Sequence, residues 1–181
     1  DTYTFYTQKN FPGQLSDFLQ RIPHEKPLRT ARVFTSADNR FVLDVFEFGE
    51  SAPLNHTDPL YAAKRKEISI YLQERSLAEQ TAAVLDFLCA CSARYAANSS
   101  PQRIYRHYLL TTQVQGTYGA VAQLNPTHED GSSSISIAIG RSDKQEALAR
   151  IARHFGFLGI DIRRAHLETI HFTPEESVSL L

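Results

Sequence analysis

A glycine-containing turn near the start of the chain is the segment most suited to holding a ligand. The run Asn10-Phe11-Pro12-Gly13-Gln14 joins a short aromatic run to an amphipathic stretch. Glycine allows a close approach of the backbone at such a junction, and the free N–H groups of a helix start can hold a carboxylate. We therefore predict a ligand-binding turn; a plain tight turn is the alternative. The expected backbone donors come from Asn10, Pro12, Gly13 and Gln14.

The remaining reactive side chains do not have the spacing that catalysis or metal binding requires. Seven histidines are present, and no pair is spaced H-x-x-x-H, which would place two metal ligands on one helical face. Cys89 and Cys91 lie two residues apart in an expected helix and are interpreted as buried small hydrophobic residues. Neither a dinucleotide fingerprint nor a phosphate-binding loop occurs. We predict no catalytic residue, no metal site and no cofactor bound by this chain.

The charge balance, the lengths of the apolar runs and the cysteine count argue against several classes of function. Nineteen Lys and Arg oppose twenty Asp and Glu, so the formal net charge is −1. A nucleic-acid-binding protein would need a basic excess, and no apolar run approaches the ~20 residues of a membrane span. Two cysteines in 181 residues do not make a disulfide framework, so we expect a cytoplasmic protein that binds neither nucleic acid nor membrane. The basic pairs Arg150/Arg153 and Arg163/Arg164 are interpreted as solvated faces, the second with an anion or subunit contact as the alternative.

The periodicity of apolar residues predicts the elements that position the turn. Strands are expected at 3–6, 29–36, 40–48, 118–124, 134–139 and 160–172, and helices at 14–22, 59–72, 77–97, 101–113 and 143–155. The strand at 40–48 is apolar on both faces, which is typical of a central strand, and Asp44 is its polar exception. This order predicts an α+β fold of two ferredoxin-like units with antiparallel sheets, separated by a helical insert.

We expect the boundaries to fall at 1–50 for the first unit, 51–115 for the insert and 116–172 for the second unit. Residues 173–181 are expected to start a helix, because Thr173, Pro174 and Glu176 fit a capping box with proline at its first turn. That helix would be cut off at Leu181, so the chain is expected to be a fragment of a longer protein.

Two motifs of the first fifty residues carry a family resemblance. The run from Lys9 to Ile22, with Pro12-Gly13-Gln14-Leu15 at its centre and an apolar helix after it, resembles the opening of ACT domains. The segments 31–35 and 38–46 resemble the second and third strands of the same domain. The ACT opening usually has Asp where Asn10 stands, which weakens a direct contact to a ligand amine.

The second half of the chain is similar to the large NAD-dependent glutamate dehydrogenases, in the region upstream of their catalytic domain. The similar segments are Ser100-Pro101-Gln102-Arg103, Gln113-Val114-Gln115-Gly116-Thr117, the run from Ala147 to Gly156, and the run from Gly159 to Leu167. This resemblance implies a parent enzyme that converts glutamate to 2-oxoglutarate and ammonia. It places NAD and the catalytic residues in a further domain that these 181 residues do not contain.

The resemblance implies a non-catalytic regulatory or assembly role. The expected partners are the catalytic domain of the same chain, further copies in a homo-oligomer, and an amino-acid effector held by Asn10, Phe11, Pro12, Gly13 and Gln14. Two alternatives stay open: a purely structural oligomerisation module without a ligand, and the ACT region of a nitrogen-control nucleotidyltransferase.

Overall fold

The computed structural model describes every residue of the chain except 9, 10, 12, 23–27, 37, 39, 50, 51, 126–132, 142, 143, 161, 174 and 175. The chain divides into two compact units. Unit 1 consists of Asp1–Glu50 and Ser142–Leu167, and unit 2 consists of Ser51–Arg141 and Glu168–Leu181. The α+β class expected from the sequence is confirmed.

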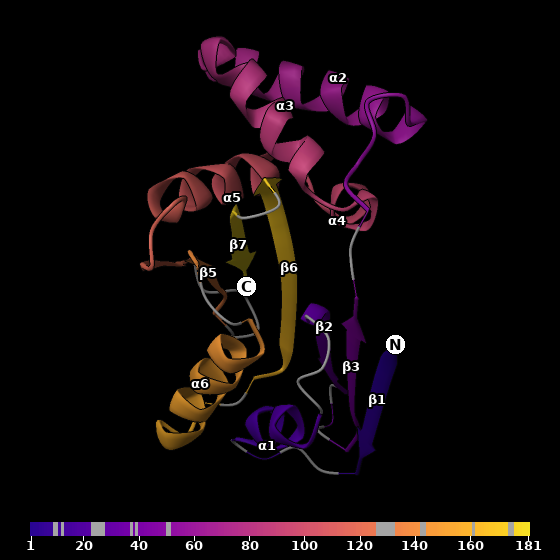
Figure 1. The fold of residues 1–181 in the computed structure, drawn as a ribbon, viewed down its shortest axis with the longest axis vertical. Coiled ribbons are helices and arrows are strands. Elements are labelled where there is room, and N and C mark those ends of the chain that lie inside the picture. The colour runs from indigo at the N-terminus through magenta and orange to yellow at the C-terminus, as the bar shows by residue number, and fades with distance from the viewer. Residues whose placement is uncertain are drawn as a thin grey trace. The chain divides into compact units, whose positions relative to one another are not determined.

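Unit 1 has the element order strand, helix, strand, strand, helix, strand (Figure 1). Its elements are β1 (Thr2–Thr7), α1 (Gln14–Arg21), β2 (Leu28–Thr35), β3 (Val42–Phe48), α6 (Lys144–Phe157) and the first residues of β6 (Arg164–Thr173). β3 pairs antiparallel with both β1 and β2, as its two apolar faces predicted, and β6 adjoins β2. In a split βαβ unit the last strand lies beside the first, so the element order is ferredoxin-like and the strand order is not.

Helices α1 and α6 lie side by side and cover one face of β1, β3 and β2 (Figure 1). α1 buries Leu15, Phe18 and Leu19, the apolar positions of its predicted helical stripe, and Phe18 stacks on Phe5 of β1 with ring centroids 4.6 Å apart. The buried Gln145 of α6 donates from Nε2 to the carbonyl oxygens of Leu19 (2.9 Å) and Ile22 (3.1 Å). Because the last carbonyls of a helix have no partner within it, this side chain ends α1 and fastens it to α6.

Unit 2 combines a helical layer with the remaining strands. Its elements are α2 (Pro59–Gln73), η1 (Ala78–Gln80), α3 (Thr81–Ala90), α4 (Ala93–Asn98), α5 (Pro101–Val114), β4 (Ala120–Leu124), β5 (Ile135–Ile139), β7 (Glu176–Leu180) and the rest of β6. The strand order is β6-β7-β5-β4, with antiparallel pairing throughout. Side chains of Asp58 and Ser100 cap α2 and α5, each followed by a proline that suits the first helical position.

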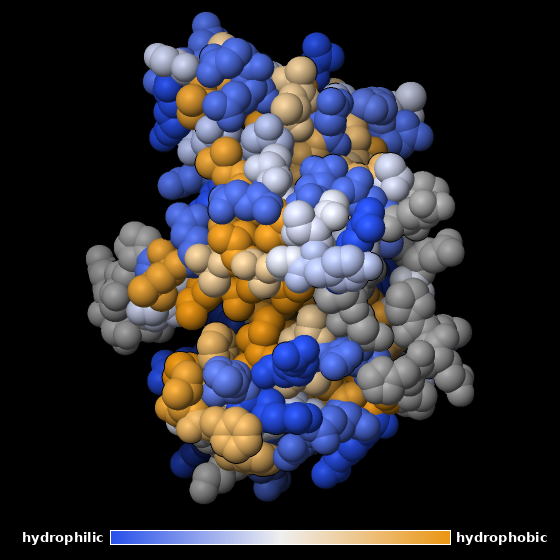
Figure 2. All heavy atoms as spheres, turned by 60° about the vertical axis from the view of Figure 1, so that its left-hand side comes forward, coloured by the Kyte–Doolittle hydropathy of each residue, from blue (hydrophilic) through white to orange (hydrophobic). Residues whose placement is uncertain are grey.

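The helices of unit 2 share a core with its strands. Tyr95 of α4 is fully buried, and its hydroxyl lies 2.8 Å from Nδ1 of the buried His107 of α5. On the face that Figure 2 shows, the region of α2 and α3, at the top, is mainly hydrophilic. The core of unit 2 consists of Leu54, Ile68, Leu72, Val84, Phe87, Leu88, Cys91, Tyr95, Ala96, Ile104, Leu110, Val114, Ala138, Ile170, Val178 and Leu180. The predicted insert, 51–115, thus packs with the strands that follow it.

Two of the predicted helices differ in the structure. The helix expected at 77–97 is divided into η1, α3 and α4. The backbone is extended at Cys91, which ends α3, and the Ser92 side chain caps α4 by accepting from the N–H of Tyr95. The Cys91 carbonyl accepts from the N–H of Leu54, and the Ser92 N–H donates to Glu168 of β6. These long-range hydrogen bonds replace the ones that a continuous helix would make.

The helix expected at 173–181 is wrong: residues Glu176–Leu180 form strand β7. Val178 and Leu180 are buried in the core of unit 2, and β7 pairs with both β6 and β5. Tertiary pairing of this short segment outweighs the local capping signal, as it commonly does for isolated propensities. No helix in the described part of the chain is long and apolar enough to cross a membrane.

Gly140 provides a test of the packing in unit 2. A Cβ atom at this position would be in hard contact with the backbone carbonyl oxygens of Val114 and Thr117. We expect Gly140→Ala to lower the free energy of unfolding by about 1–3 kcal/mol, the usual cost of overpacking. Urea unfolding measures this change. At Gly119 the nearest atom to an added Cβ is the side-chain hydroxyl of Thr117 at 3.1 Å, a milder contact, so Gly119→Ala is the control and should cost less. Equal losses would contradict the packing argument.

Candidate functional site

The N-terminus of α1 is built from the turn that the sequence singled out. Gly13 adopts a left-handed backbone conformation (φ 92°, ψ −10°), which favours glycine, and no side chain caps the helix here. The N–H of Gln14 donates to the carbonyl of Phe11 at 3.1 Å and closes the turn. The buried side chain of Gln14 accepts from the N–H of Phe11 at 3.3 Å and donates to Oγ1 of Thr7. Gln14 therefore ties β1 to the turn.

Two backbone donors in the first turn of α1 have no acceptor among the described residues. Within the part of the chain that the structure describes, the N–H groups of Leu15 and Ser16 make no hydrogen bond. The N–H groups of a first helical turn point out of the N-terminal end, where the helix dipole also favours negative charge. This end of α1 can therefore accept an anionic group such as a carboxylate.

Asp44 is the buried acid of unit 1. It lies on β3 between Phe5 of β1 and Val33 of β2, and only 1% of its surface is exposed. Its Oδ1 atom has no hydrogen-bond partner among the described residues. Burial raises the pKa of Asp44 to about 7, because the charged form loses its hydration without gaining a partner.

A small cavity connects Asp44 with the start of α1. Its volume is about 10 Å³, which is room for one water molecule. Phe11, Gly13 and Gln14 contribute from the turn, and none of the residues that line it is a cation. The residues that line this Asp44 cavity are Phe11, Gly13, Gln14, Leu15, Val33, Val42, Asp44, Ala152, Ile160 and Ile162.

The chemistry of the Asp44 cavity is that of a receptor for a small cation. An ammonium group is close to the size of water and would give Asp44 the partner it lacks. A charged hydrogen bond of this kind is stronger than a neutral one, and the ammonium would also hold the carboxylate in its ionised form. The unused N–H groups of Leu15 and Ser16 suit the opposite charge. The Asp44 carboxylate would thus accept hydrogen bonds from the ammonium group of an α-amino acid. The two N–H groups would donate to its carboxylate.

Three of the five predicted site residues line the Asp44 cavity. Phe11, Gly13 and Gln14 lie at one cavity, whereas Asn10 and Pro12 lie outside the described residues. Two of the expected donor roles do not hold: the Gln14 N–H is already bonded to Phe11, and proline carries no N–H at all. Asp44 was not predicted as a site residue. The available signal was an acid at an inward-facing position of a strand that is otherwise apolar.

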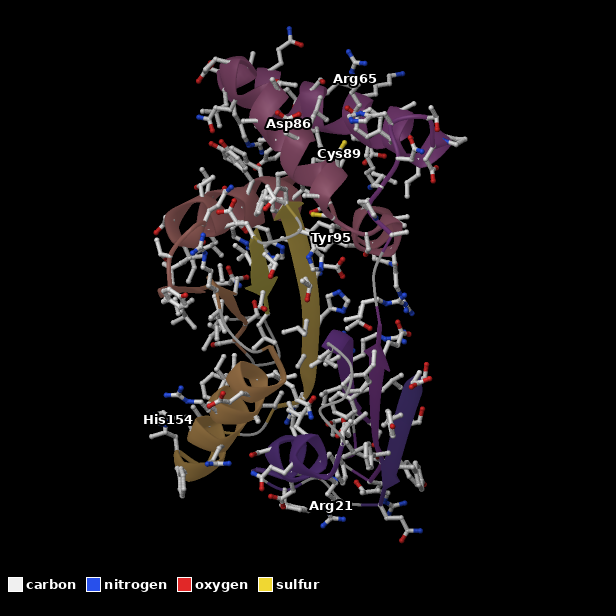
Figure 3. The ribbon with its side chains drawn as sticks, in the orientation of Figure 1. Arg21, Arg65, Asp86, Cys89, Tyr95 and His154 are labelled. Atoms are coloured by element: carbon white, nitrogen blue, oxygen red, sulfur yellow. The ribbon has the colours of Figure 1, made fainter. Side chains whose placement is uncertain are left out.

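A cysteine and a histidine approach each other in unit 2. Cys89 of α3 lies with Sγ 3.6 Å from Nδ1 of His56, and Figure 3 labels it together with Asp86 on the same helix. Burial raises the pKa of the Cys89 thiol, and it raises that of the fully buried Cys91 much further. A reactive cysteine usually has a lowered pKa, so this shift does not favour a nucleophilic role for Cys89. Cys91 is buried as predicted, and Cys89 is partly exposed.

Comparison of the chain with models of protein families, with curated proteins and with solved structures finds no match in any of the three.

The pKa of Asp44 makes a pH-dependent contribution to stability. An unfolded chain ionises this carboxyl at the ordinary value of 3.8, whereas the folded chain keeps its proton up to about pH 7. The proton stabilises the fold below pH 4, and that stabilisation is lost as the pH rises to about 7. The full loss is on the order of 4 kcal/mol.

Asp44→Asn removes the ionisable group while nearly keeping its size, so the difference between wild type and variant isolates this effect. We expect wild type to lose stability relative to Asp44→Asn between pH 4 and pH 8, measured by urea unfolding at several pH values. A constant cost of burying the amide leaves this slope unchanged. A difference that does not vary with pH would contradict the assignment.

Proposed function

We propose that this chain is a non-catalytic regulatory module that binds an amino acid at the Asp44 cavity. The observation that carries the proposal is the buried Asp44 carboxyl, which borders a cavity at the start of α1 and has no partner for Oδ1 among the described residues. Buried polar groups are nearly always hydrogen-bonded, so an unpartnered one needs an explanation. A bound cationic group supplies it.

The dimensions of the cavity define how the ligand would bind. A volume of about 10 Å³ admits the ammonium group alone, so the rest of the ligand lies outside. The ligand carboxylate would then accept from the N–H groups of Leu15 and Ser16 at the α1 N-terminus. Recognition would depend on the two charged groups common to all amino acids. The side chain would contact the surface around the cavity, where Phe11 is half-exposed.

Asp44 takes the role that the turn itself cannot fill. ACT-like segments usually carry an acid at the position of Asn10, and here the acid of the same unit is on β3. We infer a sensor in which the turn around Gly13 forms part of the cavity wall and Asp44 of β3 provides the negative charge. Ionised Asp44 is required for ligand binding, so affinity should increase as the pH rises through about 7.

The resemblance supports a wider context for this module. We propose that it belongs to the N-terminal regulatory region of a cytoplasmic NAD-dependent glutamate dehydrogenase, where an amino acid would report on the supply of substrate or product. NAD and the chemical step would belong to the catalytic domain of that parent. The partner of the module would be that catalytic domain.

Calorimetry of the complete chain against a panel of amino acids tests the proposal. At pH 8 we expect saturable binding of at least one amino acid, and a loss of at least tenfold in affinity for Asp44→Asn, because a charge-assisted hydrogen bond is worth roughly 1.5–3 kcal/mol. Gly13→Leu should also remove binding, since its φ of 92° strains any other residue.

Gly49→Leu is the matched control. Gly49 lies in the same unit with φ 119°, an added Cβ meets no atom within 4 Å at either glycine, and Gly49 does not line the cavity. This variant should bind as wild type does. Flat titrations across the whole panel, or unchanged affinity in Asp44→Asn, would overturn the sensing role; a water molecule in the cavity would then be the partner of Asp44.

A further inference from the structure

A groove runs between α1 and α6, the two helices of unit 1 that lie side by side in Figure 1. Its volume is about 340 Å³, which is within the range of small-molecule sites. α1 contributes Leu19 and Gln20, and α6 contributes the other lining residues, which lie between Gln145 and Arg153. No residue lines both this groove and the Asp44 cavity, so the two are separate places in unit 1. We call it the interhelical groove.

The two buried residues that line the interhelical groove hold its walls together. Leu19 is 1% exposed and Gln145 is 4% exposed. Nε2 of Gln145 donates to the carbonyl oxygens of Leu19 and Ile22, which fixes the spacing between the helices at this point. The groove is therefore formed before a ligand binds, and a preformed site loses little free energy to reorganisation.

Two arginines of α6 line the interhelical groove without a partner in the described part of the chain. Arg150 and Arg153 lie three residues apart, so they occupy neighbouring positions on one helix face. Both are exposed, and neither forms an ion pair or a side-chain hydrogen bond with a described residue. Arg29 and Arg32 of β2, by contrast, both donate to Glu47. The two groove arginines are thus available to an anionic ligand.

The pair of guanidinium groups favours a phosphate over a carboxylate. One guanidinium can satisfy both oxygens of a carboxylate, whereas a phosphate monoester carries three acceptor oxygens and close to two negative charges. Arg150 and Arg153 together supply two positive charges and two donor forks. Their number and spacing therefore match a single phosphate group.

Hydrogen-bond acceptors also line the interhelical groove. Glu146 lies about 6 Å from Arg150 and about 10 Å from Arg153 along the helix axis, given the rise per residue of an α-helix. Gln20 uses its Nε2 group to donate to Oγ of Ser16 at 3.2 Å, so its side-chain carbonyl oxygen is left as an acceptor. A carboxylate opposes a second anion beside it but accepts readily from hydroxyl groups. The remainder of a ligand held here is expected to carry hydroxyl groups.

We propose that the interhelical groove binds a phosphorylated polyol, such as a sugar phosphate. The phosphate would lie on Arg150 and Arg153, and the hydroxyl groups would donate to Glu146 and Gln20. This site is additional to the amino-acid site at Asp44 and does not depend on it. The competing interpretation is a solvated helix face with no ligand, as the sequence alone suggested for these two arginines.

NMR titration of the complete chain with glucose 6-phosphate tests the proposal, at about pH 7.5, where a phosphate monoester is mostly a dianion. We expect saturable shifts at the amides of α1 and α6 that line the groove. Inorganic phosphate and succinate should bind at least about fivefold more weakly, because each lacks one of the two recognised groups. Glucose itself should not bind detectably.

Three variants assign the binding to named side chains. The double variant Arg150→Gln, Arg153→Gln should weaken glucose 6-phosphate binding by at least about tenfold, because it removes the charged donors. Glu146→Ala should keep the affinity for inorganic phosphate and lose the preference for the sugar phosphate. Arg65→Gln is the matched control: it makes the same change at an exposed arginine of α2 in unit 2 (Figure 3), and it should bind as wild type does.

Several results would overturn the proposal. Thermal unfolding near that of wild type will show that the variants fold, since all four changed residues are exposed. An absence of saturable glucose 6-phosphate binding, or equal weakening in Arg65→Gln and the double variant, would leave the solvated face as the correct interpretation. Succinate binding as tightly as glucose 6-phosphate would contradict the phosphate assignment. Inorganic phosphate binding as tightly would contradict recognition of a polyol.

Discussion

Unit 1 is organised by the two-sided apolar character of β3. Val42, Phe46 and Phe48 face the helices and are buried, whereas Leu43 and Phe41 belong to the opposite face and are exposed. A strand of this kind is stable at the centre of a sheet, where neighbours on both sides protect its backbone. The Asp44 cavity follows from this arrangement, because Asp44 is the polar residue that β3 places on the covered face.

Much of the fold was predictable because periodicity and capping are local. The strand at 42–48 and the helices at 59–73 and 101–114 begin and end close to where alternation, Asp58-Pro59 and Ser100-Pro101 placed them. The break at Cys91-Ser92 and the strand at 176–180 were not predictable in this way. They depend on β6, since Glu168 holds the Ser92 N–H and β6 pairs with β7. Glu168 is 76 residues from Ser92 in sequence, and β7 also pairs with β5, which precedes α6.

At the candidate site, too, one part follows from local sequence and the other from packing between distant segments. Gly13 was identifiable from its position between a strand and a helix, and its positive φ explains why glycine suits that position. The importance of Asp44 could not be read from its neighbours in sequence. It depends on Phe5 and Val33, which flank it in the sheet, and on α6 and the residues after it, which close the cavity. The turn at Gly13 is therefore visible in the sequence, whereas Asp44 becomes a candidate site residue only through packing.

The course of the chain through the two units has a consequence for how the protein is made. Unit 1 needs residues from both sides of a segment of the chain, 51–141, that belongs to unit 2. During synthesis the apolar stripe of α1 emerges early, yet α6 and Gln145, which cover and fasten it, emerge only after that whole segment. Unit 1 therefore cannot complete its fold from residues 1–50 alone while the rest of the chain is still being made. Unit 1 is therefore completed only after residues 51–141 have been made, although its first fifty residues emerge before them.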